Sequence, residues 1–335
     1  MDGARRLGRW LRVTEARKQR MTRNRMIRRA IIFSGQGAQF VGMGKDLADK
    51  FSVCKALYDK ADEVLGYELS KICFEGSAEE LTKSNHAQPA IFVTSIACYT
   101  ALKEMNPGLE VAMMAGLSLG EWSALHASGA MTFEDTLRIL ETRGRAMQEA
   151  CDETQGSMVS VIGLSMDQLL EICEFAGVEI ANLNSEAQTV LSGELAKIEK
   201  AAAMATEMGA KRAIVLQVAG AFHSSLMTSA TSKLEKVLNS AEIQAPSIPV
   251  LANVTGKPHG GTDDIRREML KQVTGSVHWY ESINEMTAAG VSEFVECGPG
   301  KVLIGLIKRI AERGTPLHNI QDIATLEKTV EVLKA

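Results

Sequence analysis

The sequence predicts an α/β fold in which a large domain with a mostly parallel sheet carries a smaller inserted domain. Short apolar runs that end near glycines alternate along the chain with segments of helical periodicity, which is typical of a parallel sheet covered by helices. The chain of 335 residues is also longer than one hydrophobic core usually supports, so an insertion into a large domain is the natural organisation.

The large domain is expected to comprise residues 30–154 and 219–335. Its clearest strands are short and apolar, and its clearest helices repeat apolar residues at helical spacing. The predicted strands are residues 30–33, 111–115 and 294–295, and the predicted helices are residues 46–65 and 132–150.

The small domain is expected to comprise residues 155–218. Its elements follow the order β-α-β-β-α-β, which is the ferredoxin-like pattern. They are predicted at residues 158–162, 166–175, 178–181, 189–192, 195–208 and 213–218. Because this unit interrupts the longer alternation, we expect it to form one side of a ligand cleft.

Composition excludes several classes of protein. Hydrophobic residues make up 45% and charged residues 23%, close to the average of soluble globular proteins. No apolar run approaches the roughly 20 residues that a membrane helix needs. The six cysteines lie singly, without a C-x-x-C pair, which indicates reduced buried thiols. We therefore predict a cytoplasmic protein with no metal ion and no membrane contact.

Residues 1–29 are strongly basic. They hold eleven basic and two acidic residues, a net charge of +9, against −13 for the rest of the chain. Such an arm is compatible with nucleic-acid or membrane-surface binding or with a transit peptide. Serine is absent before Ser34, and Met26 lies just before the first strand, which favours translation from an early start codon. We expect a disordered arm without a nucleic-acid partner.

The chemistry concentrates in the pentapeptide Gly116-Leu117-Ser118-Leu119-Gly120. G-x-S-x-G is the nucleophile elbow of α/β-hydrolase-like domains, in which glycines permit a sharp turn that exposes the serine. The bare pattern arises by chance in roughly one chain in ten of this length. Here an apolar strand precedes it and a helix follows, which is the context that the motif requires.

An elbow serine needs a base, and His223 is the best placed of six histidines. It follows the last predicted strand of the small domain through a short turn, although a single histidine there is often structural. His126 is expected to point away within the elbow helix. His259 lies in a glycine-rich stretch, residues 255–264, that we interpret as a surface loop, and His318 lies near the terminus.

Several motifs occur together in the order and spacing of malonyl-CoA:acyl-carrier-protein transacylases, and the sequence resembles this family from about residue 30 to the C-terminus. The motifs are Gly35-Gln36-Gly37-Ala38-Gln39, Gly116 to Gly120, Arg143, Ala221-Phe222-His223-Ser224, Asn253-Val254 and Gly298-Pro299-Gly300-Lys301-Val302-Leu303.

The resemblance implies a Ser118–His223 dyad. Ser118 is the expected acyl nucleophile, and His223 is the expected base, oriented by the backbone carbonyl of Gln272. Backbone N–H groups of Gln36 and Leu119 are expected to form the oxyanion hole. The implied reaction is ping-pong transfer of a malonyl group from coenzyme A to an acyl carrier protein in fatty-acid synthesis, by a monomer without a cofactor.

The resemblance also implies how the substrate is chosen. Arg143 is expected to bind the malonyl carboxylate bidentately. Phe222 is expected to crowd out an α-methyl branch, which is limited to about 1–3 kcal/mol of discrimination. Many members have His before the serine, whereas this chain has Leu117, so selectivity or rate is expected to differ.

Two alternatives remain at this stage. A serine thioesterase would draw an acid from Asp135, Asp152 or Asp167, and a non-catalytic module would only dock carrier protein. Because carrier proteins are acidic, a basic patch is expected at the cleft mouth. Its candidates are Lys211, Arg212, Lys301, Lys308 and Arg309.

Overall fold

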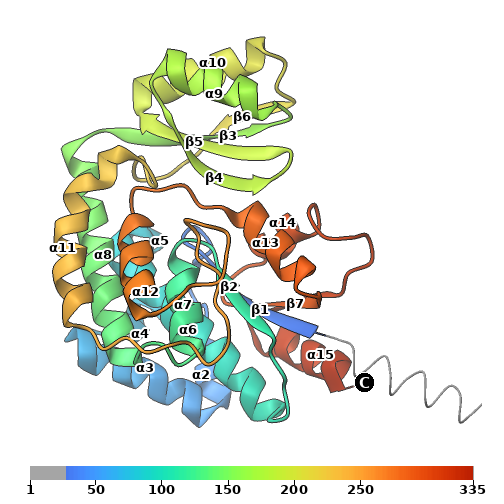
Figure 1. The fold of residues 1–335 in the computed structure, drawn as a ribbon. Helices are drawn as coiled ribbons and strands as arrows, with labels where there is room; N and C mark the ends of the chain where they lie inside the picture. Colours follow the sequence, from blue (N-terminus) through green and yellow to red (C-terminus); the bar gives the residue numbers. More distant parts are fainter. Residues whose placement is uncertain (1–27, 335) are drawn as a thin grey trace, which may run out of the picture.

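Two four-stranded sheets, one parallel and one antiparallel, organise residues 28–334, which are the residues that the computed structural model describes (Figure 1). The parallel sheet has the order β2-β1-β7-β8. Its strands are β1 (Arg28–Phe33), β2 (Met113–Gly116), β7 (Val291–Cys297) and β8 (Leu317–Ile320).

Both faces of the parallel sheet are buried. Along β1, Ile31 and Phe33 enter one hydrophobic core, whereas Ala30 and Ile32 enter the other, as the two-residue period of a strand requires. The first core contains α6 (Ser84–Met105) and α7 (Leu119–Ala127), and the second contains α13 (Trp279–Ala288) and α14 (Val302–Ile307).

The remaining helices of this parallel-sheet part surround the first core. They are α2 (Lys45–Lys50), α3 (Ser52–Leu65), α4 (Leu69–Glu75), α5 (Ala78–Thr82), α8 (Phe133–Glu153), α11 (Thr228–Ser240), α12 (Thr262–Lys271) and α15 (Ile323–Lys334), with a 3₁₀ turn at Ser225–Met227. In Figure 1, α8 and α11 stand side by side at the edge of the molecule, and α12 lies next to them.

The antiparallel sheet has the order β4-β5-β3-β6, with α9 and α10 on its outer face (Figure 1). Its elements are β3 (Gly156–Ile162), α9 (Met166–Ala176), β4 (Glu179–Ser185), β5 (Gln188–Glu194), α10 (Leu195–Glu207) and β6 (Arg212–Val215). A separate core, including Val159, Ile172 and Ile198, lies between sheet and helices. Ser165 and Gln168 form a capping box at the start of α9.

The antiparallel part is tied to the parallel part along the edge of β4. The backbone N–H of Leu183 donates to Val277 O at 2.9 Å, and the N–H of Val277 donates to Ala181 O at 2.8 Å. Val277 lies two residues before the start of α13, so this edge strand is paired with the other part of the molecule.

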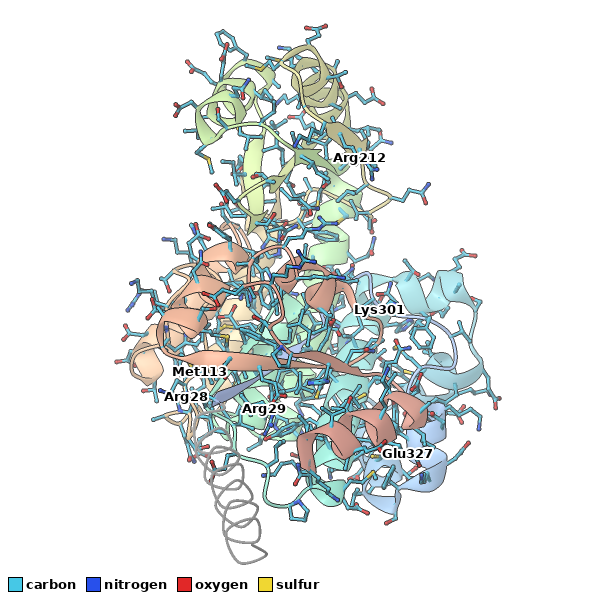
Figure 2. The ribbon with its side chains drawn as sticks, turned by 90° about the vertical axis from the view of Figure 1, so that its right-hand side faces the viewer. Arg28, Arg29, Met113, Arg212, Lys301 and Glu327 are labelled. Carbon is cyan, nitrogen blue, oxygen red and sulfur yellow. The ribbon has the colours of Figure 1, made fainter. Side chains whose placement is uncertain are left out.

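The predicted α/β class, with a parallel and an antiparallel sheet, is confirmed. β1 begins at Arg28, so the strand takes in the last two residues of the predicted arm, and the rest of that arm lies outside the described residues. Figure 2 shows Arg28 and Arg29 at this strand start, near Met113. The side chain of Arg29 is fixed there by Glu293, with Nε 2.6 Å from Oε2.

Two element predictions need correction, and two elements were missed. The helix predicted at residues 46–65 is two helices, because Phe51 is extended (φ −111°) and buries its ring in the core. The strand predicted to reach Val218 ends at Val215. The strand β8 and the long helix α6 were not predicted. α6 is apolar on nearly all sides, so it lacks the amphipathic pattern that reveals a surface helix.

Within residues 28–334, no helix is long and apolar enough to span a membrane.

Candidate active site

Ser118 occupies a strained turn between β2 and α7. Its backbone has φ 53° and ψ −102°, values that only a constrained turn holds for a residue with a side chain. The flanking glycines are sterically required: a Cβ on Gly116 would lie 1.9 Å from the carbonyl carbon of Gly120, and a Cβ on Gly120 would lie 2.1 Å from Phe33 O. The elbow therefore depends on both glycines.

Asn253 clamps this turn from the far side. Its Oδ1 accepts from the backbone N–H of Ser118 at 2.6 Å, and its Nδ2 donates to Gly116 O at 2.8 Å. The N–H of Ser118 is thereby occupied and is not free to bind an oxyanion. The clamp also explains the Asn253-Val254 motif, for which no role was predicted.

His223 faces Ser118 from the connection after β6. Its Nε2 lies 2.8 Å from Ser118 Oγ, and its Nδ1 lies 2.9 Å from the backbone carbonyl oxygen of Gln272. Gln272 follows the last turn of α12, where carbonyls have no partner within the helix. A carbonyl only accepts, so the proton sits on Nδ1, and Nε2 is the acceptor for the Ser118 hydroxyl.

The environment keeps His223 neutral. Burial first, and the Arg143 guanidinium second, lower its pKa to about 4. Its backbone is strained as well, with φ 59°. Among the non-glycine residues of the described chain, only Ser118 and His223 have a positive φ. Backbone strain that is confined to the two members of a dyad is typical of an active site.

Arg143 projects from α8 to a position beside the serine and is 1% exposed. Its Nη2 donates to Ser118 Oγ and to Gln272 Oε1, each at 3.1 Å, and its Nη1 donates to Gln88 Oε1 at 2.7 Å. All three acceptors are neutral. Burial lowers the pKa of Arg143 to about 10, partly opposed by the charge of Glu121. Arg143 is therefore a buried cation whose hydrogen bonds reach no carboxylate.

The two residues expected to form the oxyanion hole border the site: Gln36 lines the same cavity as Ser118, and Leu119 follows Ser118 in the chain. Leu119 is the first residue of α7, so its N–H has no acceptor within the helix. Gln36 follows β1, and its side chain is held by Ser84 Oγ at 3.1 Å and by Gln88 at 3.2 Å. A Cβ on Gly35 would lie 2.7 Å from Leu117 O, so this loop packs directly against the elbow.

A cavity of about 350 Å³ opens over the dyad, between the two sheets. The parallel-sheet part contributes Gln36, Leu117 and Ser118, and the connection after β6 contributes Phe222 and His223. The antiparallel sheet contributes Met158, Asn182, Asn184 and Val190. Phe222 packs against the small core that Met158, Ala181 and Val190 form. The volume is within the range of small-molecule sites.

A family model for the acyl transferase domain matches residues 30–328. The malonyl CoA-acyl carrier protein transacylase of Bacillus subtilis is 41% identical over 310 residues, which are 91% of this chain and 97% of the relative. The transacylase of Escherichia coli K12 is 40% identical, with 84% and 93% covered. The chain belongs to the malonyl CoA-acyl carrier protein transacylase family.

Solved transacylase structures agree with this assignment. The structure from Clostridium perfringens is 40% identical, with a TM-score of 0.87 over 92% of this chain and 97% of that one. A malonyl-transacylase in complex with a type II polyketide synthase acyl-carrier protein is 37% identical, with a TM-score of 0.87 over 91% and 99%. The resemblance of the sequence to the transacylases is thus confirmed.

The acids expected for a thioesterase do not reach the dyad of this transacylase fold. Asp135 lies in the first turn of α8, Asp152 is exposed beside Gln148, and Asp167 is exposed at the start of α9. In the described chain, the Nδ1 of His223 contacts the Gln272 carbonyl and no carboxylate.

Of two histidines that were predicted to lie away from the site, His126 has the predicted environment and His259 does not. His126 packs its ring against Phe92 and Phe133 and contacts Met131 O, away from the dyad, as predicted. The interpretation of residues 255–264 as a surface loop is wrong for His259, whose side chain is 0% exposed. Backbone bonds from His259 N to Val250 O and from Ala252 N to Lys257 O fold this segment back onto the molecule.

Sequence reasoning also missed Gln88 and Glu121. Gln88 connects Gln36 to Arg143 from near the start of α6, and Glu121 accepts from Gln272 Nε2 at 2.6 Å. Neither belongs to a recognised catalytic pattern. Glu121 directly follows the elbow pentapeptide, which was the available signal, but an acid in the first turn of a helix usually only complements the helix dipole.

The five basic residues proposed for carrier docking are exposed. Figure 2 shows Arg212 on the antiparallel part and Lys301 on the parallel part. Arg309 bridges the two parts, because its Nη1 donates to Gln188 Oε1 at 2.7 Å, and Gln188 also lines the cavity.

Proposed function

We propose that the chain transfers a malonyl group from malonyl-CoA to the phosphopantetheine thiol of an acyl carrier protein through an ester on Ser118. The observation that carries the proposal is Arg143: a buried cation with only neutral hydrogen-bond acceptors lies beside a Ser–His dyad. Such a cation suits an acyl group that bears its own carboxylate. The names of the relatives agree with this substrate.

Acylation begins when Ser118 Oγ attacks the thioester carbonyl while His223 Nε2 takes its proton. The negative charge that forms on the carbonyl oxygen is bound by the backbone N–H groups of Gln36 and Leu119. His223 then gives the proton to the departing thiolate of coenzyme A. Deacylation repeats these steps in reverse, with the carrier thiol as nucleophile, which gives ping-pong kinetics.

Arg143 fixes the acyl group. Its planar guanidinium binds the malonyl carboxylate through two charge-assisted hydrogen bonds, which an acetyl group cannot form. Phe222 borders the same cavity and disfavours an α-methyl branch by its bulk. Leu117 contributes apolar surface to the same cavity.

We also propose the finer architecture and setting. The parallel part is an α/β-hydrolase-like domain of residues 30–154 and 219–335, and the antiparallel part is a ferredoxin-like insertion of residues 155–218. The strand order and the element succession of the two sheets support this division. The dyad and its partners all come from one chain, which supports a monomer. The six free cysteines support a reducing compartment, the cytoplasm. The reaction needs neither a metal ion nor a cofactor.

Intact mass after incubation with malonyl-CoA tests the proposal. Wild type should gain one malonyl adduct, Ser118→Ala should gain none, and added carrier protein should remove the adduct from wild type and appear malonylated itself. Free malonate released without carrier would instead indicate a thioesterase. Absence of both adduct and malonate would leave only a docking module, for which the basic residues Lys211, Arg212, Lys301, Lys308 and Arg309 would be the contact surface.

A further inference from the structure

A histidine with a carboxylate at each ring nitrogen is buried beside the elbow helix. His259 Nε2 lies 2.9 Å from Glu121 Oε1, and His259 Nδ1 lies 2.6 Å from Glu268 Oε2. The side chains of His259 and Glu121 are 0% and 1% exposed, and that of Glu268 is 14% exposed. Because each nitrogen faces an acceptor, only the imidazolium, with N–H on both nitrogens, satisfies both contacts.

The contact between His259 and Glu121 is electrostatic in character. The two atoms are close but not aligned as a hydrogen bond, and neither has another hydrogen-bond partner among the described residues. Burial lowers the pKa of His259, but the nearby carboxylates of Glu121 and Glu268 outweigh this effect, so the pKa is raised overall. His259 is therefore a buried cation in the resting site.

The second oxygen of Glu121 reaches the catalytic residues. Glu121 Oε2 accepts from Gln272 Nε2 at 2.6 Å and from the backbone N–H of Asn253 at 3.1 Å. The other side of the Gln272 amide, Oε1, accepts from Arg143. One amide thus separates Glu121 from Arg143. Its Nε2 donates to Glu121 and, at 2.9 Å, to Ser118 O, so both acceptors fix its orientation.

The positive and negative charges around the Gln272 side-chain amide balance each other. Two carboxylates contact His259: Glu121 on α7 and Glu268 on α12. A third, Asp264 on α12, is more distant and is paired with Arg267. The remaining charged group is Arg143 on α8, which lies beyond Glu121. Glu121 is the carboxylate whose field acts on Arg143. If His259 lost its charge, Arg143 would be the remaining buried cation near Glu121. The attraction between Arg143 and Glu121 would then be stronger.

We propose that His259, as an imidazolium, is a positioning residue that balances the charge of Glu121 and so keeps Arg143 available for the carboxylate of the acyl substrate. Glu268 supports it from α12, one helical turn before Gln272, so the same contact also holds the helix end whose carbonyl orients His223. The inference rests on the proposed function, because it concerns the affinity for a substrate carboxylate.

The first test is the pH dependence of acylation in Glu268→Gln. Single-turnover acylation by malonyl-CoA is followed by intact mass between about pH 6 and 9, around the ordinary histidine pKa. In wild type, the malonyl-CoA concentration at half-maximal rate should rise as the pH passes upward through the pKa of His259. Glu268→Gln removes one of the two carboxylates that keep the ring protonated, so this rise should move to lower pH.

Two controls isolate the effect. His318→Gln alters another histidine–glutamate pair, which is partly buried and joins β8 to β7: His318 lies 3.2 Å from Glu293. This variant should leave the pH profile unchanged. Acetyl-CoA carries no carboxylate, so its concentration at half-maximal rate should not follow the titration of His259 in any variant.

The second test is a rescue. His259→Gln should raise the malonyl-CoA concentration at half-maximal rate about tenfold at neutral pH, a common size for a coupling between neighbouring groups. His259→Gln combined with Glu121→Gln removes both charges and should recover most of that loss. A merely structural histidine would not be rescued by a second substitution in the core. Melting temperatures are measured in parallel, because the charged pair stabilises the fold below about pH 6.5 and loses this effect as the pH rises through the raised pKa.

Either of two results would overturn the inference. The first is a pH profile of Glu268→Gln that equals that of wild type. The second is a malonyl-CoA concentration at half-maximal rate that is as high in the variant with both His259→Gln and Glu121→Gln as in His259→Gln alone. If His259→Gln does not fold, the Glu268→Gln profile decides alone. Absence of any malonyl adduct on wild type would overturn the proposed function itself, and that result is seen before a variant is made.

Discussion

The two sides of the cavity are built in different ways. On the parallel-sheet side, hydrogen bonds link the groups proposed to react. His223 and Arg143 each bond to Gln272, and each also bonds to the Ser118 hydroxyl. On the antiparallel side, Met158 and Val190 offer apolar surface, and Asn184 Oδ1 is buried without a hydrogen-bond partner in the described chain.

The difference indicates that one side carries out the reaction and the other binds the substrate. A bond-forming step tolerates little displacement, so its groups are held by several contacts each and by a strained backbone. A wall that shapes a flexible substrate arm needs only surface and a few polar atoms. Substitutions on the first side should therefore affect the rate strongly, and those on the second side should affect affinity or selectivity weakly.

The largest effect should come from His223→Ala. Removing the general base should slow acylation of Ser118 by about 10³-fold, within the usual range for such groups. The substitution also removes a buried side chain and should lower the melting temperature, but the protein should stay folded at the assay temperature, so the loss of rate reports the missing base. Single-turnover acylation and the melting temperature check this together. A variant that keeps more than a tenth of the rate would show that another group accepts the proton.

Arg143→Ala should come next and should discriminate between acyl groups. Loss of a charge-assisted clamp should reduce malonyl transfer by roughly 10- to 100-fold and leave acetyl transfer nearly unchanged. Arg145→Ala is a matched control, because Arg145 lies two residues further along α8 and its side chain is 58% exposed. Acylation rates with malonyl-CoA and acetyl-CoA decide the matter, and an equal loss for both substrates would contradict the clamp.

The pH dependence should separate the dyad from an ordinary histidine. Because the pKa of His223 is lowered to about 4, acylation should stay constant on acidification past pH 6 and halve only near pH 4. Above about pH 6.5 the His223 ring is neutral in both the folded and the unfolded chain, and its full contribution to stability is present. As the pH falls from there to the pKa of the folded state, the unfolded chain binds a proton first, and the free energy of unfolding drops by about 3 kcal/mol. Rates and melting temperatures from about pH 3.5 to 7 measure both effects. A midpoint near pH 6.5 would contradict the buried, neutral base.

The sequence predicted the groups of this site that lie in short local patterns. Ser118 is flanked by the two glycines that its turn requires, so it was proposed from its neighbours, whereas the base role of His223 came from the resemblance to the transacylases. Gln88, Glu121 and His259 escaped because their roles arise only when α6, α7 and the segment before α12 pack together. Glycine and proline around His259 indicated a surface loop, whereas backbone bonds to Val250 and Ala252 hold the segment against the core.

The fold shows the same limit. The strands of the antiparallel part were predicted within a few residues, since each alternates and ends at a turn. α6 was missed because a helix buried on nearly all sides has no polar face to reveal its period. β6 stops early because it becomes the cavity wall: residues 216–219 line the cavity after the strand has ended.

Phe222→Ala tests the boundary between the two sides, where Phe222 touches Met158 and Val190. Opening this space should raise methylmalonyl transfer relative to malonyl transfer by about tenfold, within the limit for one methyl group. Phe175→Ala provides the comparison, because Phe175 lies on α9 and is 60% exposed. A competition between the two thioesters, read by the mass of the adduct, gives the ratio directly. An unchanged ratio would assign selectivity to other residues, Leu117 first.

The smallest effect should come from Asn184→Ala on the antiparallel side. Asn184 lines the cavity, and its Oδ1 is buried without a hydrogen-bond partner among the described residues, so we expect its side chain to turn toward an amide N–H of the pantetheine arm. Its loss should raise KM for malonyl-CoA about threefold, the value of one modest hydrogen bond, and leave kcat unchanged. Ser192→Ala is the matched control, because Ser192 Oγ is also buried without a partner but does not line the cavity. A fall in kcat for Asn184→Ala would mean that this side of the cavity also positions the reacting groups.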